Sequence, residues 1–202
     1  MKKILTILCA TLMISTSFAQ NADKSQAAKE FVESVGNKII TVASEKDSES
    51  KKRDKIIAII DDSIDSDWIA RFVLGKNFKT STPEQQQRFT GLYRQFMINT
   101  YGPKFKNYNG RKFTVSEVVE RNGFYIAKAE FLPRDSNVAI LVDFRVKERN
   151  SKLVILDFIV EGVSLVETQR SEFNSAISQN GMDKFMDELA ERVKKLKAGN
   201  NV

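Results

Sequence analysis

Carboxylates are the main groups in this sequence that can carry out chemistry. The 202 residues contain no histidine and a single cysteine, Cys9. This composition excludes Ser-His-Asp and Cys-His nucleophile pairs, histidine acid–base catalysis, and zinc sites built from histidine or cysteine. Asp143 or Asp157 can act as a general base if it is desolvated and lies beside an electrophilic donor such as a tyrosine.

Two arginines are candidates for binding an anion. The planar guanidinium groups of Arg71 and Arg170 match the geometry of a phosphate group. The competing interpretation is a structural ion pair with Asp157, Asp67 or Glu161, and we favour that interpretation.

The N-terminus has the pattern of a secretory signal peptide. Lys2 and Lys3 precede the apolar run 4–14, and small residues follow at 15–17 and at Ala19. This run is shorter than the roughly 20 residues that a membrane-spanning helix needs. We therefore expect a signal peptide over residues 1–19, cleaved before Gln20, which removes Cys9 and directs the chain out of the cytoplasm.

The charge of the remaining chain is modest. Removal of Lys2 and Lys3 lowers the net charge of +6 to +4. Basic clusters at 51–55 and 194–197 have acidic neighbours on expected helices, which is typical of a solvated helix face. The sequence therefore predicts no nucleic-acid partner.

Helical spacing of apolar residues dominates both ends of the chain. Thr82, Pro83 and Gln85 form the signal of a capping box, and Ser164 with Glu167 forms another. Ser164 is accordingly expected to cap a helix. The predicted helices cover residues 23–42, 48–64, 66–74, 83–103, 164–180 and 182–197, with Pro103 ending or kinking the fourth.

The middle of the chain changes to the two-residue period of strands. The predicted strands are 113–121, 124–132, 138–148 and 152–160. Asn122 and Gly123 favour a tight hairpin, and the other connections are also short. The fold class is therefore α+β with a four-stranded antiparallel sheet.

The last strand is apolar on both faces. Residues 153–160 read LVILDFIV, whereas a strand with one solvated face alternates apolar and polar residues. Either this strand is covered on both sides in a dense core, or one side lines an internal cavity. Periodicity alone leaves both interpretations open.

Two blocks of residues resemble the MlaC or toluene-tolerance family of periplasmic phospholipid-binding proteins. The first block is Asp67–Gly75 with the sequence DWIARFVLG, followed by Phe78, the capped Pro83, and Phe89. The second runs from Asp157 through VEGVSLV at 160–166 to Arg170, Phe173, Ile177 and Gly181. The resemblance covers the chain after the signal peptide, although Gln169 stands where the family often has an aromatic residue.

The resemblance implies a fold and a domain organisation. The sheet is expected to be twisted, of the NTF2-like kind, and wrapped by six or seven helices. Residues 20–202 would form one domain, with a helical part at 20–109, the sheet at 110–162 and C-terminal helices at 163–198. Gly162 is expected to give the turn after the sheet a positive φ.

The resemblance also implies a function. It is that of a periplasmic carrier, with no enzyme activity and no cofactor, that shuttles phospholipid between an outer-membrane lipoprotein and porin complex and an inner-membrane ABC transporter complex. Such transport maintains the lipid asymmetry of the outer membrane. Moving one acyl chain of about sixteen carbons through water costs on the order of 12 kcal/mol, so a carrier needs a dry cavity.

The residues expected to contact the lipid come from the sheet and from two helices. The expected acyl-chain wall is Tyr93, Met97, Tyr101, Val142, Phe144, Val146, Ile155, Phe158, Val160, Val163, Val166 and Phe173. Each of these residues fits a solid core as well as it fits a cavity wall. The candidate head-group contacts are Arg71, Arg170 and Ser164.

Two other function classes remain as alternatives. NTF2-like sheets also form enzyme pockets with a buried aspartate base, for which Asp143 or Asp157 would serve. A plain interaction module without a ligand is the third class. The lipid content of the purified protein separates the three.

Overall fold

The helices begin and end close to the residues whose capping signals predict them. The computed structural model describes residues 5–106, 110–133 and 137–199. Its helices are α1 (Leu5–Ser44), α2 (Glu49–Ser63), α3 (Ser66–Leu74), α4 (Lys76–Thr80), α5 (Pro83–Lys106), α6 (Leu165–Asn180) and α7 (Met182–Gly199).

Both predicted capping interactions are present. The Thr82 hydroxyl accepts the Gln85 N–H at 3.2 Å, and the Gln85 side-chain oxygen accepts the Thr82 N–H at 3.0 Å. The Ser164 hydroxyl accepts the Glu167 N–H at 3.0 Å. These bonds satisfy N–H groups that the first turn of a helix leaves without partners, and so they fix where α5 and α6 begin.

The helices differ from the sequence prediction mainly in three ways. The helix expected over 23–42 extends from Leu5 to Ser44, so most of the expected signal peptide falls within α1, and residues 1–4 lie outside the described residues. The helix expected to end or kink at Pro103 continues to Lys106, since a proline costs a helix one hydrogen bond without always ending it. The short α4 was not predicted.

The sheet contains five antiparallel strands in chain order. They are β1 (Gly110–Arg121), β2 (Phe124–Pro133), β3 (Ile140–Arg149), β4 (Lys152–Val160) and β5 (Val163–Ser164). The predicted count of four was too low because two-residue β5 is too short to show a period. The predicted start of the third strand at Val138 was also wrong, since the pairing of β2 with β3 ends at Phe131 and Ile140.

Three strand connections are two-residue turns with positive φ at both positions. They are Asn122 and Gly123 (54° and 74°), Asn150 and Ser151 (49° and 60°), and Glu161 and Gly162 (49° and 82°). Positive φ at both positions is the type I′ pattern, whose twist matches that of the strands it joins. The predicted hairpin at Asn122 and the positive φ at Gly162 are therefore confirmed.

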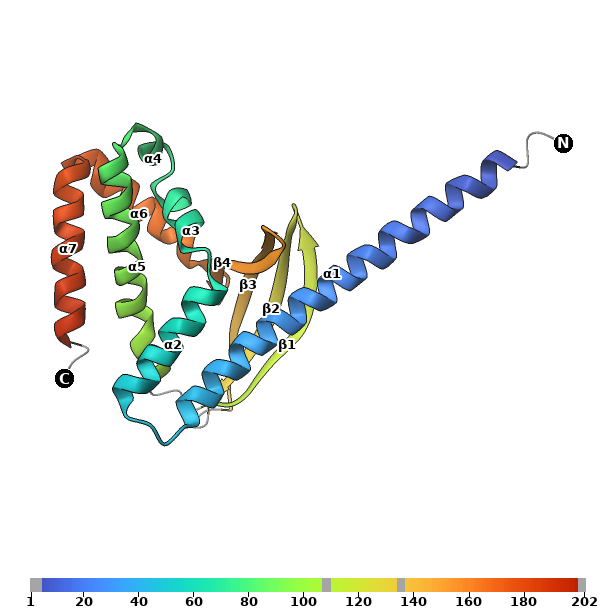
Figure 1. The fold of residues 1–202 in the computed structure, drawn as a ribbon, viewed down its shortest axis with the longest axis horizontal. Helices are drawn as coiled ribbons and strands as arrows, with labels where there is room; N and C mark the ends of the chain where they lie inside the picture. The colour runs from blue at the N-terminus through green and yellow to red at the C-terminus, as the bar shows by residue number, and fades with distance from the viewer. Residues whose placement is uncertain (1–4, 107–109, 134–136, 200–202) are drawn as a thin grey trace.

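The buried apolar residues form two clusters. One lies among α3, α5, α6 and α7, and the other lies between α1 and the sheet. Figure 1 shows the four helices grouped on one side and α1 crossing the sheet on the other, with α2 between them. Ile64, at the end of α2, packs against both clusters. Across the described residues, no helix is both long enough and apolar enough to cross a bilayer.

Candidate functional site

One face of the sheet carries rows of apolar side chains that run across the strands. A row is defined here by residues that are directly paired, because paired residues point to the same face. The open row consists of Val115, Ala129, Val142, Val160 and Val163, one from each strand. The exposed fraction rises along it, from 1% at Val115 through half-buried Val142 and Val160 to 57% at Val163.

The neighbouring rows define where this face is closed. Towards the hairpin ends of β2 and β3, Tyr125, Val146 and Ile155 are paired and buried. Between that row and the open row, Ala127 is buried while Phe144 and Phe158 are half-buried, with their rings edge to face at 5.4 Å. The face is thus closed at one corner and accessible at the opposite one.

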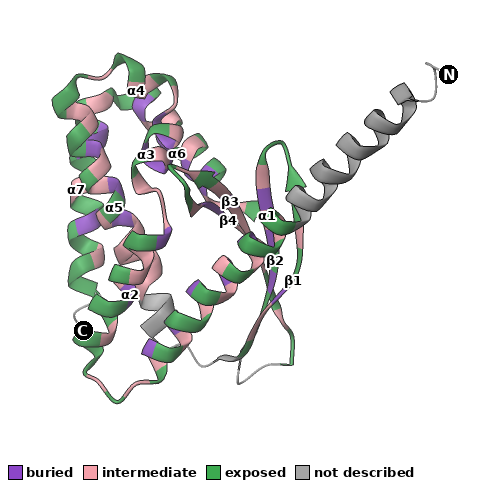
Figure 2. Ribbon diagram, turned by 45° about the vertical axis from the view of Figure 1, so that its right-hand side comes forward, coloured by how far each residue is buried: buried purple, intermediate pink, exposed green. Residues whose placement is uncertain are grey.

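Helix α1 covers the β1 and β2 side of this face. Its buried residues Ala28, Val32, Val35 and Ile39 belong to the same cluster as Val115. Buried residues recur along α1 and on the strands beside it (Figure 2). Gly36 permits the close approach, because a Cβ there would lie 2.5 Å from the Phe113 ring. The rise in exposure towards β5 follows from this one-sided cover.

The predicted helix residues Tyr93, Met97 and Tyr101 meet at one buried amide. The Tyr93 hydroxyl donates to Oε1 of Gln169 at 2.5 Å, and Nε2 of Gln169 contacts Met97 Sδ at 3.3 Å and Tyr101 Oη at 3.2 Å. Tyr93 and Gln169 are 1% and 4% exposed, whereas Met97 and Tyr101 are half-buried. Burial, assisted by the neighbouring Tyr101 and Asp157, holds the pKa of Tyr93 well above its usual value. Tyr93 is therefore a hydrogen-bond donor at neutral pH.

The twelve predicted wall residues occupy three environments. Five of them lie inside the two solid clusters, namely Tyr93, Val146, Ile155, Val166 and Phe173. Six are half-buried, namely Met97, Tyr101, Val142, Phe144, Phe158 and Val160, and Val163 is exposed. The half-buried sheet residues are directly paired neighbours, so the structure brings them together on one face.

Of the three candidate head-group residues, Arg170 and Ser164 bind other groups of the protein in this conformation. Arg170 donates to the carbonyl of Phe72 and its guanidinium lies 4.7 Å from the Phe72 ring centroid. It thus binds a carbonyl near the C-terminus of α3, where the end of a helix carries partial negative charge. Ser164 caps α6 as predicted, and Arg71 is exposed.

Asp157 connects the end of the sheet to α6. It is 1% exposed, and its Oδ2 accepts the Ser164 hydroxyl at 2.6 Å while Oδ1 accepts the Val166 N–H at 3.2 Å. Arg145 lies 3.7 Å from Oδ2. Both carboxylate oxygens therefore already bind donors that hold the β4–α6 junction. Asp143, the other candidate base, is half-buried on the opposite face of the sheet from the open row.

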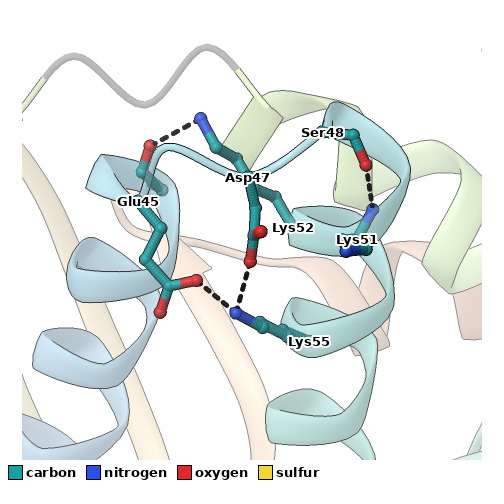
Figure 3. Close-up of polar contacts among 7 residues, drawn as sticks. Glu45, Asp47, Ser48, Lys51, Lys52 and Lys55 are labelled. Carbon is teal, nitrogen blue, oxygen red and sulfur yellow. Dashed lines mark hydrogen bonds and ion pairs between the residues drawn. The ribbon is translucent and has the colours of Figure 1, made fainter.

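A separate pocket lies between α1 and α2. Its volume is about 370 Å³, and it is lined by Ser34, Asn37, Lys38, Thr41, Val42 and Ile59. The turn beside it is held by ionic contacts (Figure 3): Lys55 binds Glu45 and, at 2.6 Å, Asp47, while Lys52 donates to the Ala43 carbonyl. The hydrogen bond with Lys55 lowers the pKa of the Asp47 carboxyl. These contacts fix α1 against α2, and none of the lining residues belongs to the sheet.

Sequence reasoning missed several residues that shape the site. Ala127 and Ala129 alternate with polar residues along β2 and are the smallest side chains of the apolar face, a signal that was available in the sequence. Gln169 was noted as a departure from a family pattern, yet periodicity cannot reveal that a polar residue is buried. The described residues contain no cluster of three side chains able to hold a metal ion.

The fold and the site define a class of small α+β binding proteins with an apolar sheet face that helices cover on one side. The model of the MlaC protein family matches residues 29–191, so the chain belongs to the MlaC family. The family resemblance of the sequence is thereby confirmed.

Two curated relatives and one solved structure agree with this membership. The chain is 24% identical over 147 residues to the toluene tolerance protein ttg2D of Pseudomonas putida, covering 71% of this chain and 68% of that protein. It is 21% identical over 121 residues to the intermembrane phospholipid transport system binding protein MlaC of Haemophilus influenzae, covering 58% of this chain and 56% of that one.

The solved structure is that of the phospholipid-binding protein from Ralstonia solanacearum in complex with a phospholipid. It matches with a TM-score of 0.74 at 19% identity, covering 84% of this chain and 98% of the other. This similarity establishes the shared α+β fold.

Proposed function

We propose that this protein binds a phospholipid and holds its acyl chains against the apolar face of the sheet. The observation that carries the proposal is the open row, along which exposure increases from Val115 to Val163. At the accessible end of this face, half-buried valines and phenylalanines lie next to each other in paired positions, as a surface that receives an acyl chain requires. Family membership and the phospholipid bound by the Ralstonia protein support the same ligand class.

The energetics of an acyl chain agree with this placement. Each methylene removed from water contributes about 0.8 kcal/mol, and no head-group contact of comparable strength is needed for binding. The chain would lie on Val142, Val160, Phe144 and Phe158, with the short side chains of Ala127 and Ala129 beside them. Met97 and Tyr101 are the half-buried residues of α5 that we assign to the opposite wall.

We further propose that the protein acts as a periplasmic carrier. The signal peptide expected over residues 1–19 would export the chain, and the partners would be an outer-membrane lipoprotein and porin complex and an inner-membrane ABC transporter complex. Transport between them would maintain the lipid asymmetry of the outer membrane. The name of the Haemophilus relative, an intermembrane phospholipid transport system binding protein, supports this role.

An enzyme reaction at a buried aspartate is the less favoured function. Asp157 is poorly placed to accept a proton from a substrate, because its two carboxylate oxygens already bind the Ser164 hydroxyl and the Val166 N–H and lie beside Arg145. No cofactor is proposed, and the phospholipid is cargo.

Mass spectrometry of lipid extracted from the purified protein tests the proposal. We expect close to one glycerophospholipid per protein molecule, and reduced occupancy in Val142→Trp, whose larger side chain would fill the open row. Val119→Trp is the matched control, since Val119 lies on the opposite face of β1 and is 37% exposed.

Circular dichroism must first show that both variants fold. Folded Val142→Trp with unchanged occupancy would contradict the placement of the lipid. Absence of lipid from the unmodified protein, after incubation with phospholipid vesicles, would contradict the function itself.

A further inference from the structure

Glu161 holds the corner of the sheet where β3 begins and β4 ends. Its N–H donates to the carbonyl of Leu141 at 3.2 Å, and its carboxylate Oε1 accepts the Leu141 N–H at 3.0 Å. The side chain therefore supplies an acceptor that a strand carbonyl supplies elsewhere in an antiparallel ladder. Because the regular pairing of β3 with β4 reaches Val142 and Val160, Glu161 extends it by one residue.

The backbone at Glu161 is unfavourable for a glutamate. Its φ is 49°, in the left-handed region that glycine, asparagine and aspartate tolerate best. The corresponding positions of the other two type I′ turns are Asn122 and Asn150. The turn imposes this conformation on Glu161, and a glutamate kept at such a position is a candidate for a functional role.

The corner fixed by Glu161 adjoins the accessible end of the apolar face. Ile140, Leu141 and Val163 are 39%, 50% and 57% exposed, and Val163 ends the open row. Leu141 neighbours Val142, which is the β3 member of that row. Any movement of the start of β3 therefore shifts Val142 relative to Val160 and Val163 at the accessible end of the open row.

We propose that Glu161 is a latch at the mouth of the site that limits how fast an acyl chain enters and leaves. It is a positioning residue, because it acts through the backbone of Leu141 and not by touching the ligand. The identity of the gated ligand rests on the proposed function, whereas the latch itself is a property of the sheet corner.

Two substitutions separate the side-chain bond from the turn. Glu161→Gln retains an oxygen at the same reach, so it keeps the bond to Leu141 without the charge. Glu161→Asn is one methylene shorter and loses that bond, while asparagine suits the positive φ of the turn. The turn is therefore preserved in Glu161→Asn, and misfolding is not the expected outcome.

Amide hydrogen exchange measures the latch without any lipid. In Glu161→Asn we expect the Leu141 amide to exchange about tenfold faster, equivalent to about 1.4 kcal/mol, with the amide of Val146 unchanged. In Glu161→Gln the Leu141 amide should stay within about threefold of the unmodified protein. Equal exchange at Leu141 in the unmodified protein and Glu161→Asn would overturn the latch.

Transfer of a fluorescent phospholipid from vesicles measures the gate. Because Glu161 would limit both the entry and the release of the lipid, both rates should increase about tenfold in Glu161→Asn, and the Kd should stay unchanged. Faster release with weaker binding would mean that Glu161 itself binds the lipid. Unchanged transfer rates with faster amide exchange would mean that this corner of the sheet does not limit lipid entry and release. Either result overturns the proposal. If the unmodified protein takes up no lipid, the proposed function is wrong, and so is the role of Glu161 in lipid entry and release. The amide exchange still shows whether Glu161 holds the backbone of Leu141.

Discussion

The buried hydrogen bond between Tyr93 and Gln169 gives a prediction whose size follows from the structure. The two atoms are 2.5 Å apart and their residues are 1% and 4% exposed, so water cannot readily replace a lost partner. Tyr93→Phe leaves the Gln169 oxygen without this donor, and Gln169→Leu leaves the Tyr93 hydroxyl without its acceptor. Each change should destabilise the protein by about 1–3 kcal/mol, which is the usual cost of a buried group that loses its hydrogen-bond partner.

The double variant should lose less than the sum of the two single variants. With both polar groups removed, neither is left buried without the other, so we expect a coupling energy of about 1–2 kcal/mol. The assay is urea unfolding followed by circular dichroism. With a denaturant slope of about 2 kcal/mol per molar, a coupling of about 1 kcal/mol moves the midpoint by about 0.5 M relative to the additive expectation.

A distant pair provides the control for this cycle. Val115 belongs to the cluster between α1 and the sheet, whereas Tyr93 belongs to the helical cluster. Tyr93→Phe and Val115→Ala should therefore be additive within about 0.5 kcal/mol. Additive behaviour of Tyr93→Phe with Gln169→Leu as well would refute the reasoning that the two groups depend on each other.

Three further predictions concern pH and local geometry. Because burial raises the pKa of Tyr93, the unfolded chain loses this proton first, and stability should fall above pH 10 by up to about 1.4 kcal/mol per pH unit. Urea midpoints between pH 9 and 11 should show a shallower fall in Tyr93→Phe, and identical slopes would contradict this. Gly75→Ala should cost about 1–3 kcal/mol in thermal unfolding, since φ is 57° there and a Cβ would lie 2.7 Å from the Arg170 guanidinium; an unchanged Tm would argue against that strain. Asp157→Ala should lower the free energy of unfolding by about 2–5 kcal/mol, and Ser164→Ala by about 0.5–2 kcal/mol. A larger loss in Ser164→Ala would mean that the helix cap, and not Asp157, holds the junction between β4 and α6.

The fold was largely predictable because its signals are local. The capping residues at Thr82 and Ser164 and the turn at Asn122 act within four residues of themselves, and the structure confirms each of them. The missed strand β5 depends on its pairing with β4, which is a tertiary contact. Helix α1 is likewise longer than residues 23–42, the range over which the spacing of apolar residues predicts a helix.

The candidate site was harder to predict because a period of apolar residues indicates burial and not what lies opposite. Val146 and Val142 belong to the same alternation in β3, yet Val146 is buried in the cluster between α1 and the sheet and Val142 is half-buried in the open row. The difference depends on tertiary packing, which the alternation within one strand does not specify. Arg170 was a reasonable anion-binding candidate from its type, but its neighbour in space is the carbonyl of Phe72.

The division of the interior into two clusters affects how the protein could adapt to acyl chains of different shape. Ile64 packs against both clusters, and beside it the main chain of Asp65 donates to the Ile155 carbonyl at 3.4 Å. The bonds of Asp157 to Ser164 and Val166 form a second connection between the sheet and the helices, so we expect any movement between the two clusters to be a small rotation about these two connections that keeps the packing inside each cluster. If the protein binds a phospholipid as proposed, such a rotation would make room for straight and bent hydrocarbon tails alike.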